Sequence, residues 1–261
     1  MKTALTILAI AVAVFSTAAL IAFAALDREL PPGVAGAEAD ALAHEIMEQV
    51  NIEAWRQTGA VSWTFKGNRR HLWDRRRHLA QVKWGETEVI VDLGGHEARA
   101  WVAGAEALGP ALQRLAQRAR SFWTNDAFWL NPIAKFYDEG ASRRRVMTEE
   151  GPALLITYSN VGQTPGDSYL WHHSGRGLPT SWQMWVSNIP VGGLSATWEG
   201  WRRLDTGALV ATAHRFGPVT LRLTEVEGAA DLEDLVEFDP FCRLDSVPCK
   251  ESTLRRGSPS E

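Results

Sequence analysis

Short segments in which apolar and polar residues alternate recur along most of this chain. Val61, Trp63 and Phe65 share one side of an extended backbone, and polar residues alternate with them. A period of two residues is typical of a β-strand with one buried face. The same pattern predicts strands at 71–73, 78–84, 87–93, 98–103, 153–159, 168–173, 180–186, 196–201, 209–216 and 219–226. Turn residues separate these segments, so we expect an antiparallel sheet.

Two segments show a helical period instead. In residues 37–55, apolar residues recur every three or four positions, which predicts an amphipathic helix. Residues 106–122 show the same spacing, and Pro110 stands near their start, where a helix tolerates proline. Residues 122–140 follow as a connector with six aromatic residues. So much ring surface must pack against a large apolar surface.

These elements together predict an α+β fold that is mainly antiparallel β. A strongly twisted sheet of about eleven strands tends to curl, so we expect a half-barrel. Two or three helices would lie on its concave side and would leave part of the concavity open. We assign this domain to residues 37–228. The predicted geometry therefore includes an internal cavity.

The first 26 residues predict export. Lys2 precedes a nearly unbroken apolar run, which is the pattern of a secretory signal peptide. Ala22-Phe23-Ala24 fits a cleavage site, but the run is also long enough to span a bilayer as an uncleaved anchor. Both alternatives predict a location in the periplasm or on the periplasmic face of the inner membrane. Residues 27–36 contain two prolines and two glycines and indicate a linker.

Residues 229–261 predict a polar C-terminal tail that carries both cysteines of the chain. Cys242 and Cys249 lie close together in the sequence, with Pro248 between them. In an exported protein, such a pair favours a local disulfide. A two-cysteine metal site would need further ligands nearby. We therefore expect neither a metal nor a cofactor.

The net charge of the chain is −4 at pH 7, which excludes the concentrated basic surface of a nucleic-acid-binding protein. Three arginine clusters are local exceptions, at 69–70, 75–77 and 143–145. Each is short and is more typical of a solvated turn or strand end than of a phosphate or lipid-headgroup site. Charge therefore does not indicate a partner.

Twelve tryptophans are the strongest functional signal in the chain. Many fall on alternating positions of predicted strands, so we expect their rings to converge inside the sheet. A pocket lined with aromatic rings is a common site for an apolar small molecule. Indole rings can also fill a solid core, although each N–H then needs an acceptor, and both possibilities stay open. The predicted ligand-binding residues are Trp63, Phe65, Trp73, Trp84, Trp101, Phe128, Trp129, Trp171, Trp185 (or Trp182 in its place) and Trp198.

The sequence offers little for catalysis, and we expect no enzyme. It contains no nucleophile elbow, no P-loop and no dinucleotide-binding glycine pattern after a strand. His71 and His78 flank a turn, but a zinc site needs three or four converging ligands. We expect a set of polar residues to form a structural cluster instead. Its members are Asp74, Arg75, Asn125, Asp126, Lys135 and Asp138.

Two short motifs carry a resemblance to known proteins. One is the turn His71-Leu72-Trp73-Asp74-Arg75, and the other is the connector from Asn125 to Leu130, followed by Lys135, Asp138 and Gly140. With the strand pattern, they resemble the exported superfamily of periplasmic lipoprotein carriers and mycobacterial lipid-binding lipoproteins. The resemblance covers about residues 38–228. It implies a half-barrel with helices in its mouth and an apolar ligand of unspecified identity.

These observations favour an exported protein that binds or carries an apolar ligand, such as a lipid or an acyl chain. If the N-terminal segment is uncleaved, the protein is also associated with the membrane. An alternative is an envelope protein with a filled core that binds another protein through a sheet edge or a surface. A hydrolase that uses the Asp and His groups near His71, Asp74 and Asp126 is a remote alternative.

Overall fold

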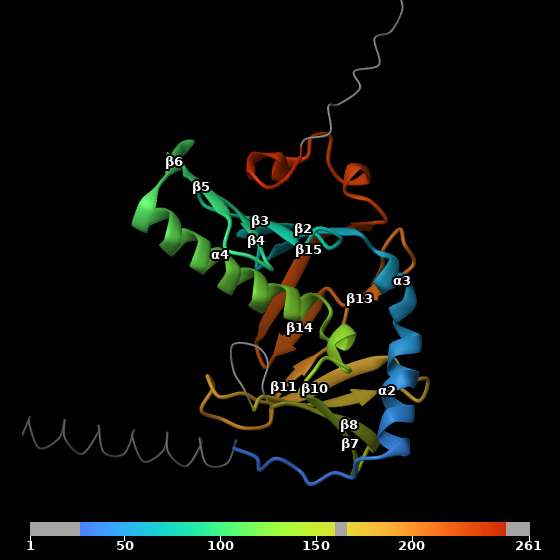
Figure 1. Ribbon diagram of the computed structural model, residues 1–261. Coiled ribbons are helices and arrows are strands. Elements are labelled where there is room, and N and C mark those ends of the chain that lie inside the picture. Colours follow the sequence, from blue (N-terminus) through green and yellow to red (C-terminus); the bar gives the residue numbers. More distant parts are fainter. Residues whose placement is uncertain (1–26, 160–165, 249–261) are drawn as a thin grey trace, which may run out of the picture. The chain divides into compact units, whose positions relative to one another are not determined.

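The computed structural model describes residues 27–159 and 166–248 (Figure 1). In this part of the chain, antiparallel sheets combine with three α-helices, which confirms the predicted α+β class. The predicted half-barrel is not confirmed, because the described strands divide into sheets of eight, five and two strands. The predicted export segment 1–26 lies outside the described residues.

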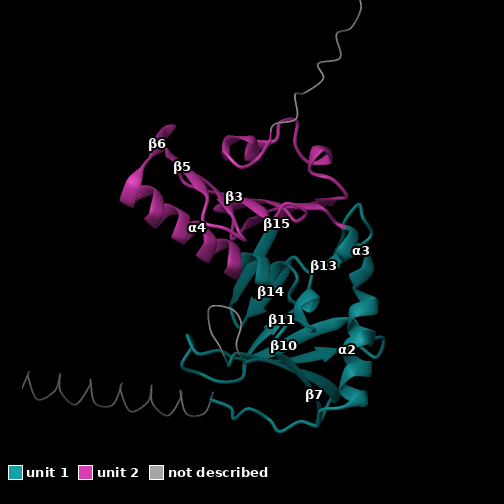
Figure 2. Cartoon of the chain, in the orientation of Figure 1, with its two compact units in different colours: residues 1–57, 126–223 teal, residues 58–125, 224–261 magenta. Residues whose placement is uncertain are grey.

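The chain forms two compact units (Figure 2). Unit 1 contains residues 1–57 and 126–223, and unit 2 contains residues 58–125 and 224–261. The chain crosses between the units three times: between Gln57 and Thr58, within helix α4 (Gly109–Leu130) and within strand β15 (Val219–Ala229). The predicted domain 37–228 thus contains parts of both units.

Unit 2 is built on a meander of consecutive antiparallel strands. Its strands are β1 (Ala60–Phe65), β2 (Arg69–Asp74), β3 (Leu79–Trp84), β4 (Thr87–Asp92), β5 (Ala98–Val102) and β6 (Ala105–Ala107). These strands confirm the alternating pattern between residues 61 and 103. β15 lies next to β1 in the same sheet and next to β14 (Ala213–Phe216) on its other side. Because side chains alternate along a strand, residues at odd and at even positions face opposite sides of the sheet and meet two different layers.

Helix α4 covers one face of this meander. Val82, Val89 and Val91 point toward the helix and pack against its small residues Ala116 and Ala119. Small side chains on the helix let it lie close to the β-branched surface of the sheet. The result is a dry aliphatic layer.

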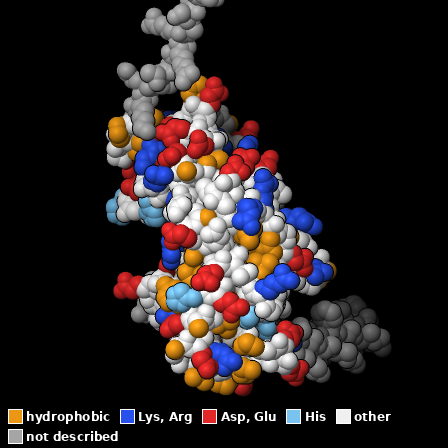
Figure 3. Space-filling view, turned by 90° about the vertical axis from the view of Figure 1, so that its right-hand side faces the viewer, with side chains coloured by type: hydrophobic (Ala, Val, Ile, Leu, Met, Phe, Trp, Pro, Cys, Tyr) orange, Lys and Arg blue, Asp and Glu red, His pale blue; other side chains and the backbone are white. Residues whose placement is uncertain are grey.

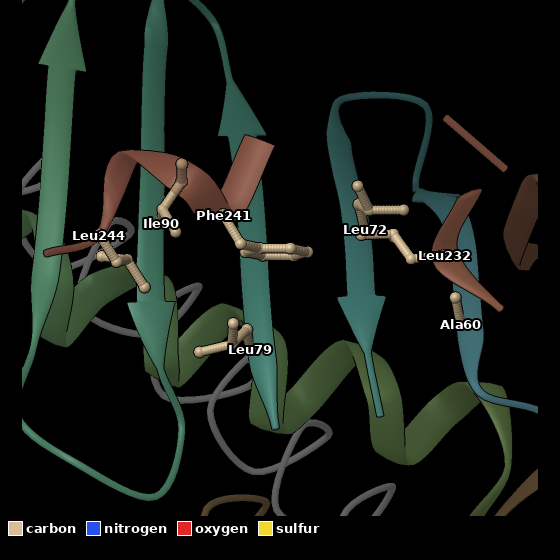
Figure 4. Packing of buried hydrophobic residues seen from close by; sticks show 7 residues of the cluster. All are labelled: Ala60, Leu72, Leu79, Ile90, Leu232, Phe241 and Leu244. Atoms are coloured by element: carbon tan, nitrogen blue, oxygen red, sulfur yellow. The ribbon is translucent and has the colours of Figure 1, made fainter. Parts of the chain in front are cut away.

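The C-terminal segment covers part of the opposite face (Figure 4). It contains the 3-10 helices η2 (Leu232–Asp234) and η3 (Pro240–Arg243). Their apolar residues pack on the sheet face that points away from α4. This second aliphatic cluster consists of Ala60, Leu72, Leu79, Ile90, Leu232, Phe241 and Leu244.

Unit 1 is built on a second antiparallel sheet, with strand order β11-β10-β9-β8-β7. Its strands are β7 (Ala141–Thr148), β8 (Gly151–Tyr158), β9 (Ser168–His173), β10 (Pro179–Trp185) and β11 (Leu194–Thr197). A short pair, β12 (Arg202–Arg203) and β13 (Leu209–Val210), precedes β14. Its helices are α2 (Ala37–Gln49), α3 (Ile52–Gln57) and the 3-10 helix η1 (Pro132–Lys135).

Helix α2 packs on one face of this sheet, which we call the inner face. Its buried residues recur every three or four positions and confirm the amphipathic pattern. Its acidic first turn pairs with β7, with Asp40 Oδ1 2.6 Å from Arg143 Nε and Glu38 Oε2 2.9 Å from Arg145 Nη1. The predicted linker 27–36 runs along the same strand, where Val34 forms a bridge with Arg145.

Several sequence interpretations differ from the structure. The predicted helix 37–55 is divided into α2 and α3, and the predicted strand 209–216 is divided into β13 and β14. Residues 122–130, predicted as part of a connector, continue α4, and only Pro132–Lys135 form a separate turn of 3-10 helix. Strand β7 was not predicted, because its three consecutive arginines interrupt the alternation of apolar and polar residues. Residues 75–77 lie in a turn with Arg76 and Arg77 exposed, as predicted, and both arginines also pair with acids: Arg76 Nη2 lies 3.3 Å from Asp231, and Arg77 Nη1 lies 2.7 Å from Asp239.

The surface carries charges of both signs. On the face that Figure 3 presents, basic and acidic side chains are interspersed, with smaller apolar groups between them. In residues 27–159 and 166–248, no helix has both the length and the apolar character that membrane crossing requires.

Candidate functional site: the aromatic cluster of unit 1

The predicted ligand-binding residues are divided between the two units. Those in unit 1 are Phe128, Trp129, Trp171, Trp185 and Trp198, and those in unit 2 are Trp63, Phe65, Trp73, Trp84 and Trp101. Four of the unit 1 residues, Phe128, Trp129, Trp171 and Trp198, contribute to one large group of rings in mutual contact. We therefore consider that group first.

Two neighbouring strands place the centre of this group. Trp171 on β9 and Trp182 on β10 lie directly opposite each other, and both project from the inner face of the sheet. Trp198 follows β11 and meets both of them, with ring centroids 4.9 Å from Trp171 and 5.0 Å from Trp182. All three indoles are at most 2% exposed. Of the two alternatives weighed from the sequence, Trp182 occupies the inner position.

Trp185 lies on the opposite, outer face, because three positions along a strand reverse the direction of a side chain. Its indole Nε1 donates a hydrogen bond to the carbonyl oxygen of Arg28 at 2.7 Å. It packs beside the aliphatic group of Val146, Leu155 and Leu170. Trp185 thus holds the extended N-terminal segment of unit 1 and does not contribute to the inner group.

Helix α4 and the turn after it bring further rings to the same place. Trp129 lies 4.9 Å from Trp182, and Phe128 lies 5.1 Å from Tyr169. Phe136, just after η1, lies 5.4 Å from Trp171. We define the aromatic cluster as these rings together: Phe128, Trp129, Phe136, Tyr158, Tyr169, Trp171, Trp182, Trp198 and His214.

The rings meet mostly edge to face. Trp171 and Trp182 are inclined at 68°, and Trp182 and Trp198 at 77°. This arrangement places the positive edge of one ring on the negative face of the next, and it stabilises each pair by about 0.5–1.5 kcal/mol beyond burial. The rings therefore interlock where they touch.

His214 is the one ionisable base in the aromatic cluster. Its ring lies 4.3 Å from Trp198, and its Nδ1 is 3.2 Å from the carbonyl oxygen of Thr197. Burial lowers the pKa of His214 to about 4, so the imidazole is neutral at physiological pH. Two tyrosines in the cluster are likewise held neutral, because burial raises the pKa of Tyr158 and of Tyr169.

Two buried donors in the aromatic cluster lack a conventional acceptor. Within the described residues, neither Trp182 Nε1 nor Trp198 Nε1 has a hydrogen-bond partner. An indole N–H aimed at a neighbouring ring makes only a weak interaction. A buried donor without an acceptor costs about 1–3 kcal/mol. The aromatic cluster thus consists mainly of apolar ring atoms but contains two hydrogen-bond donors that have no acceptor within the described residues.

In unit 2, the predicted aromatic residues occur as separate small groups. Trp63 stacks on His71 at 4.5 Å, Trp73 meets Trp123 at 5.1 Å, and Trp84 meets Phe122 at 5.3 Å. Phe65 lies under the guanidinium of Arg69, 4.8 Å from its ring. Trp101 belongs to the face that the C-terminal segment covers, where the guanidinium of Arg243 lies 4.2 Å from its ring.

The six predicted polar residues lie on several elements of the two units. Asp74 is buried and accepts a hydrogen bond from Arg77 Nε at 2.6 Å, while Arg75 donates to the carbonyl oxygen of Thr58 at 2.5 Å. Asn125 and Asp126 lie on α4, on either side of the unit boundary. Lys135 and Asp138 form a half-exposed ion pair at 2.9 Å. The prediction that the six form one structural cluster stays a prediction.

Within residues 27–159 and 166–248, no group of three or more His, Cys, Asp or Glu side chains is placed to hold a metal ion. Cys242 lies half-buried in η3, and Cys249 lies outside the described ranges. The disulfide between them stays a prediction.

Unit 2 contains a groove that the sequence did not predict, on the sheet face that the C-terminal segment covers in part. The groove has a volume of about 420 Å³. Thr64 and Gln81 form part of its lining and are buried, and Leu235 and Val236 form an apolar wall. Its charged residues come from three strands, so no local pattern in the sequence could have identified it.

Comparisons with known proteins add little. No protein-family model matches the chain, and no curated protein matches its sequence. Among solved structures, the crystal structure of a DUF1329 family protein from Desulfovibrio piger is similar to this chain at 10% identity. The match covers 73% of this chain and 92% of that chain, with a TM-score of 0.36. A similarity at this level assigns no function.

Proposed function

We propose that this protein is an exported binding protein that holds an apolar ligand against the aromatic cluster of unit 1. The two indole N–H donors of Trp182 and Trp198 are the observation that carries the proposal. They are buried among ring carbons, and a bound molecule with an acceptor oxygen would offset the cost of leaving them unpaired. The predicted export segment supplies the compartment.

The chemistry of the aromatic cluster indicates the class of ligand. The rings favour a hydrocarbon body, and the two donors favour an oxygen acceptor such as a carboxylate or an ester carbonyl. A fatty acid or an acyl ester combines both features. His214 is neutral and therefore does not require a negative charge in the ligand. The proposed role is binding or carriage without catalysis.

Because the rings interlock, the ligand must part some of them as it enters. An apolar guest that replaces ring–ring contacts with ring–chain contacts loses little dispersion energy. Its carbonyl oxygen would gain the two indole donors. The proposal thus requires the environment of Trp182 to change on binding.

The experiment is a lipid analysis of the purified protein together with a fluorescence titration with oleic acid. We expect a co-purifying acyl compound and a change in tryptophan emission. Trp182→Phe keeps a ring but removes a donor, so it should weaken binding by about three- to tenfold. Trp101→Phe in unit 2 is the matched control and should bind as the wild type does. The absence of any bound acyl compound, together with unchanged emission, would refute the proposal.

The interlocked rings favour one alternative, an envelope protein with a filled core that binds another protein. In that case the aromatic cluster serves stability alone. Purified protein would then carry no lipid, and Trp182→Phe would capture the same protein partner as the wild type. A cross-linking experiment in cells, followed by identification of the captured protein, would distinguish this alternative from the first.

A further inference from the structure

We propose that the groove of unit 2 binds a small zwitterion, a molecule with an ammonium group at one end and a phosphate or carboxylate at the other. The site is separate from the aromatic cluster and does not rest on the function proposed for it. Its volume of about 420 Å³ lies within the usual range for small-molecule sites. Four charged side chains line the groove, two basic ones on one side and two acidic ones on the other.

The positive side of the groove consists of Arg70 on β2 and Lys83 on β3. These residues are directly opposite each other in the antiparallel register. Like charges in that position destabilise a sheet. Lys83 Nζ lies 3.6 Å from Glu88 Oε1, which Arg243 also contacts, whereas Arg70 makes no ion pair within the described residues. An anion between Arg70 and Lys83 would relieve their repulsion.

The negative side consists of Glu225 and Glu227 on β15. The alternation of buried and exposed residues along this strand slips by one position at Thr224 and Glu225. Glu225 has a φ of 51°, a left-handed conformation that residues other than glycine rarely adopt. Such an irregularity re-aims the side chains that follow it. Here it places both carboxylates on the lining of the groove.

Neither carboxylate has a cationic partner within the described residues. Glu225 Oε2 accepts a hydrogen bond from Thr64 Oγ1 at 2.6 Å, which fixes its position. Glu227 is exposed and forms no ion pair in that part of the chain. An ammonium group between the two carboxylates would satisfy both.

Strand β1 separates the two sides of the groove. Thr64 on β1 is directly opposite Arg70, and it is the same residue that donates to Glu225. Arg70 on β2 therefore lies two strand spacings from β15, roughly 10 Å between backbones, and Lys83 on β3 lies three spacings away, roughly 14 Å. The long side chains of both pairs can approach each other from the two sides. A ligand with a single charge would satisfy one pair and leave the other unpaired. A zwitterion with a short linker satisfies both.

The apolar wall of Leu235 and Val236 lies beside this charged row. It suits the carbon linker of a free zwitterion and also the first carbons that follow a zwitterionic lipid headgroup. Phosphoethanolamine is the chemistry common to both sources. The experiment therefore uses one soluble probe and one membrane probe.

The soluble probe is glycerophosphoethanolamine, titrated into the purified protein by calorimetry and followed in ¹H–¹⁵N NMR spectra. We expect binding, with shifts in β1, β2 and β15. Arg70→Gln and Glu227→Gln should each weaken binding by about tenfold. The matched controls are Arg114→Gln and Glu86→Gln, two exposed residues of unit 2 outside the groove, which should change affinity less than about twofold. Inorganic phosphate alone should respond to Arg70→Gln, and ethanolamine alone to Glu227→Gln.

Co-sedimentation with vesicles distinguishes the two sources of the zwitterion. Binding to phosphatidylethanolamine vesicles, but not to phosphatidylglycerol vesicles, would identify a lipid headgroup. Binding of the soluble probe alone would identify a free solute. The proposal is overturned if the wild type does not bind glycerophosphoethanolamine, if the shifts map outside the groove, or if the two groove variants bind as the controls do. Oleic acid binding, measured on the same variants, reports separately on the aromatic cluster.

Discussion

The two units fill their interiors with different chemistry. In unit 2, valine and alanine residues of the sheet pack against alanines of α4, and leucines of the C-terminal segment pack on the other face. In unit 1, large rings take the corresponding place on the inner face of the sheet. Aliphatic side chains carry no polar atoms, so their layers need close packing but no hydrogen-bond partners. Indoles bring N–H groups, so the same degree of packing leaves donors unpaired.

This difference bears on where an apolar guest could bind. Unit 2 also contains buried indole donors without an acceptor among the described residues, at Trp63 and Trp123, but these rings lie in separate small groups and not in one large cluster. An aliphatic layer offers a ligand no hydrogen bond. An aromatic layer with unpaired donors gains hydrogen bonds if an acceptor enters. The two proposed sites also differ in this way. One is buried among the rings of unit 1, and the other is the charged groove of unit 2, on the sheet face that points away from α4.

The largest expected effect comes from removing the central ring of unit 1. Trp182→Ala should lower the free energy of unfolding by about 3–5 kcal/mol, because Trp182 is fully buried and contacts rings on every side. Urea denaturation followed by far-UV circular dichroism measures this change. Trp101→Ala, at the half-buried edge of unit 2, serves as the control and should cost less. A loss below about 1 kcal/mol in Trp182→Ala would mean that the aromatic cluster is not a packed core.

Acid should destabilise unit 1 through His214. The pKa of His214 is lowered to about 4 in the folded chain, from about 6.5 when unfolded, so the unfolded state binds more protons between these values. The contribution of neutral His214 is therefore complete above pH 6.5 and is lost as the pH falls toward 4. The expected loss is about 3 kcal/mol.

Urea midpoints measured between pH 4 and pH 7 test this pH dependence. His214→Gln cannot gain the proton and should show a flatter profile than the wild type. His78→Gln, a substitution in a turn of unit 2, is the control and should keep the steep pH profile of the wild type. Identical profiles for His214→Gln and the wild type would contradict the assignment.

A smaller effect is expected in unit 2. Leu244→Ala removes a fully buried side chain from the cover of the sheet, at a cost of about 2 kcal/mol, since a peripheral segment can partly relax into the gap. Amide hydrogen exchange should show the loss in β3 and β4, while β9 and β10 keep their protection. Equal loss of protection in both units would show that their interiors do not behave as separate cores.

Part of this architecture could be predicted because it is encoded in local periodicity. The strands between residues 61 and 102 and the helix that begins at Ala37 appear where the alternating and helical patterns place them. The antiparallel α+β class follows from the same patterns. Residues 122–130 were misjudged because a run of rings and polar residues does not itself distinguish a helix end from a connector.

The sequence by itself determined which segments form strands and helices. The spacing of apolar residues within a short segment matches the period of the backbone that the same segment forms. Only the tertiary structure decided how strands divide between two sheets, that Trp182 and not Trp185 faces inward, and that Glu225 turns toward the groove. Alternation shows that neighbouring side chains face opposite sides, but which side is buried depends on what packs there. That choice is made by residues far away in the chain, and no local pattern records it.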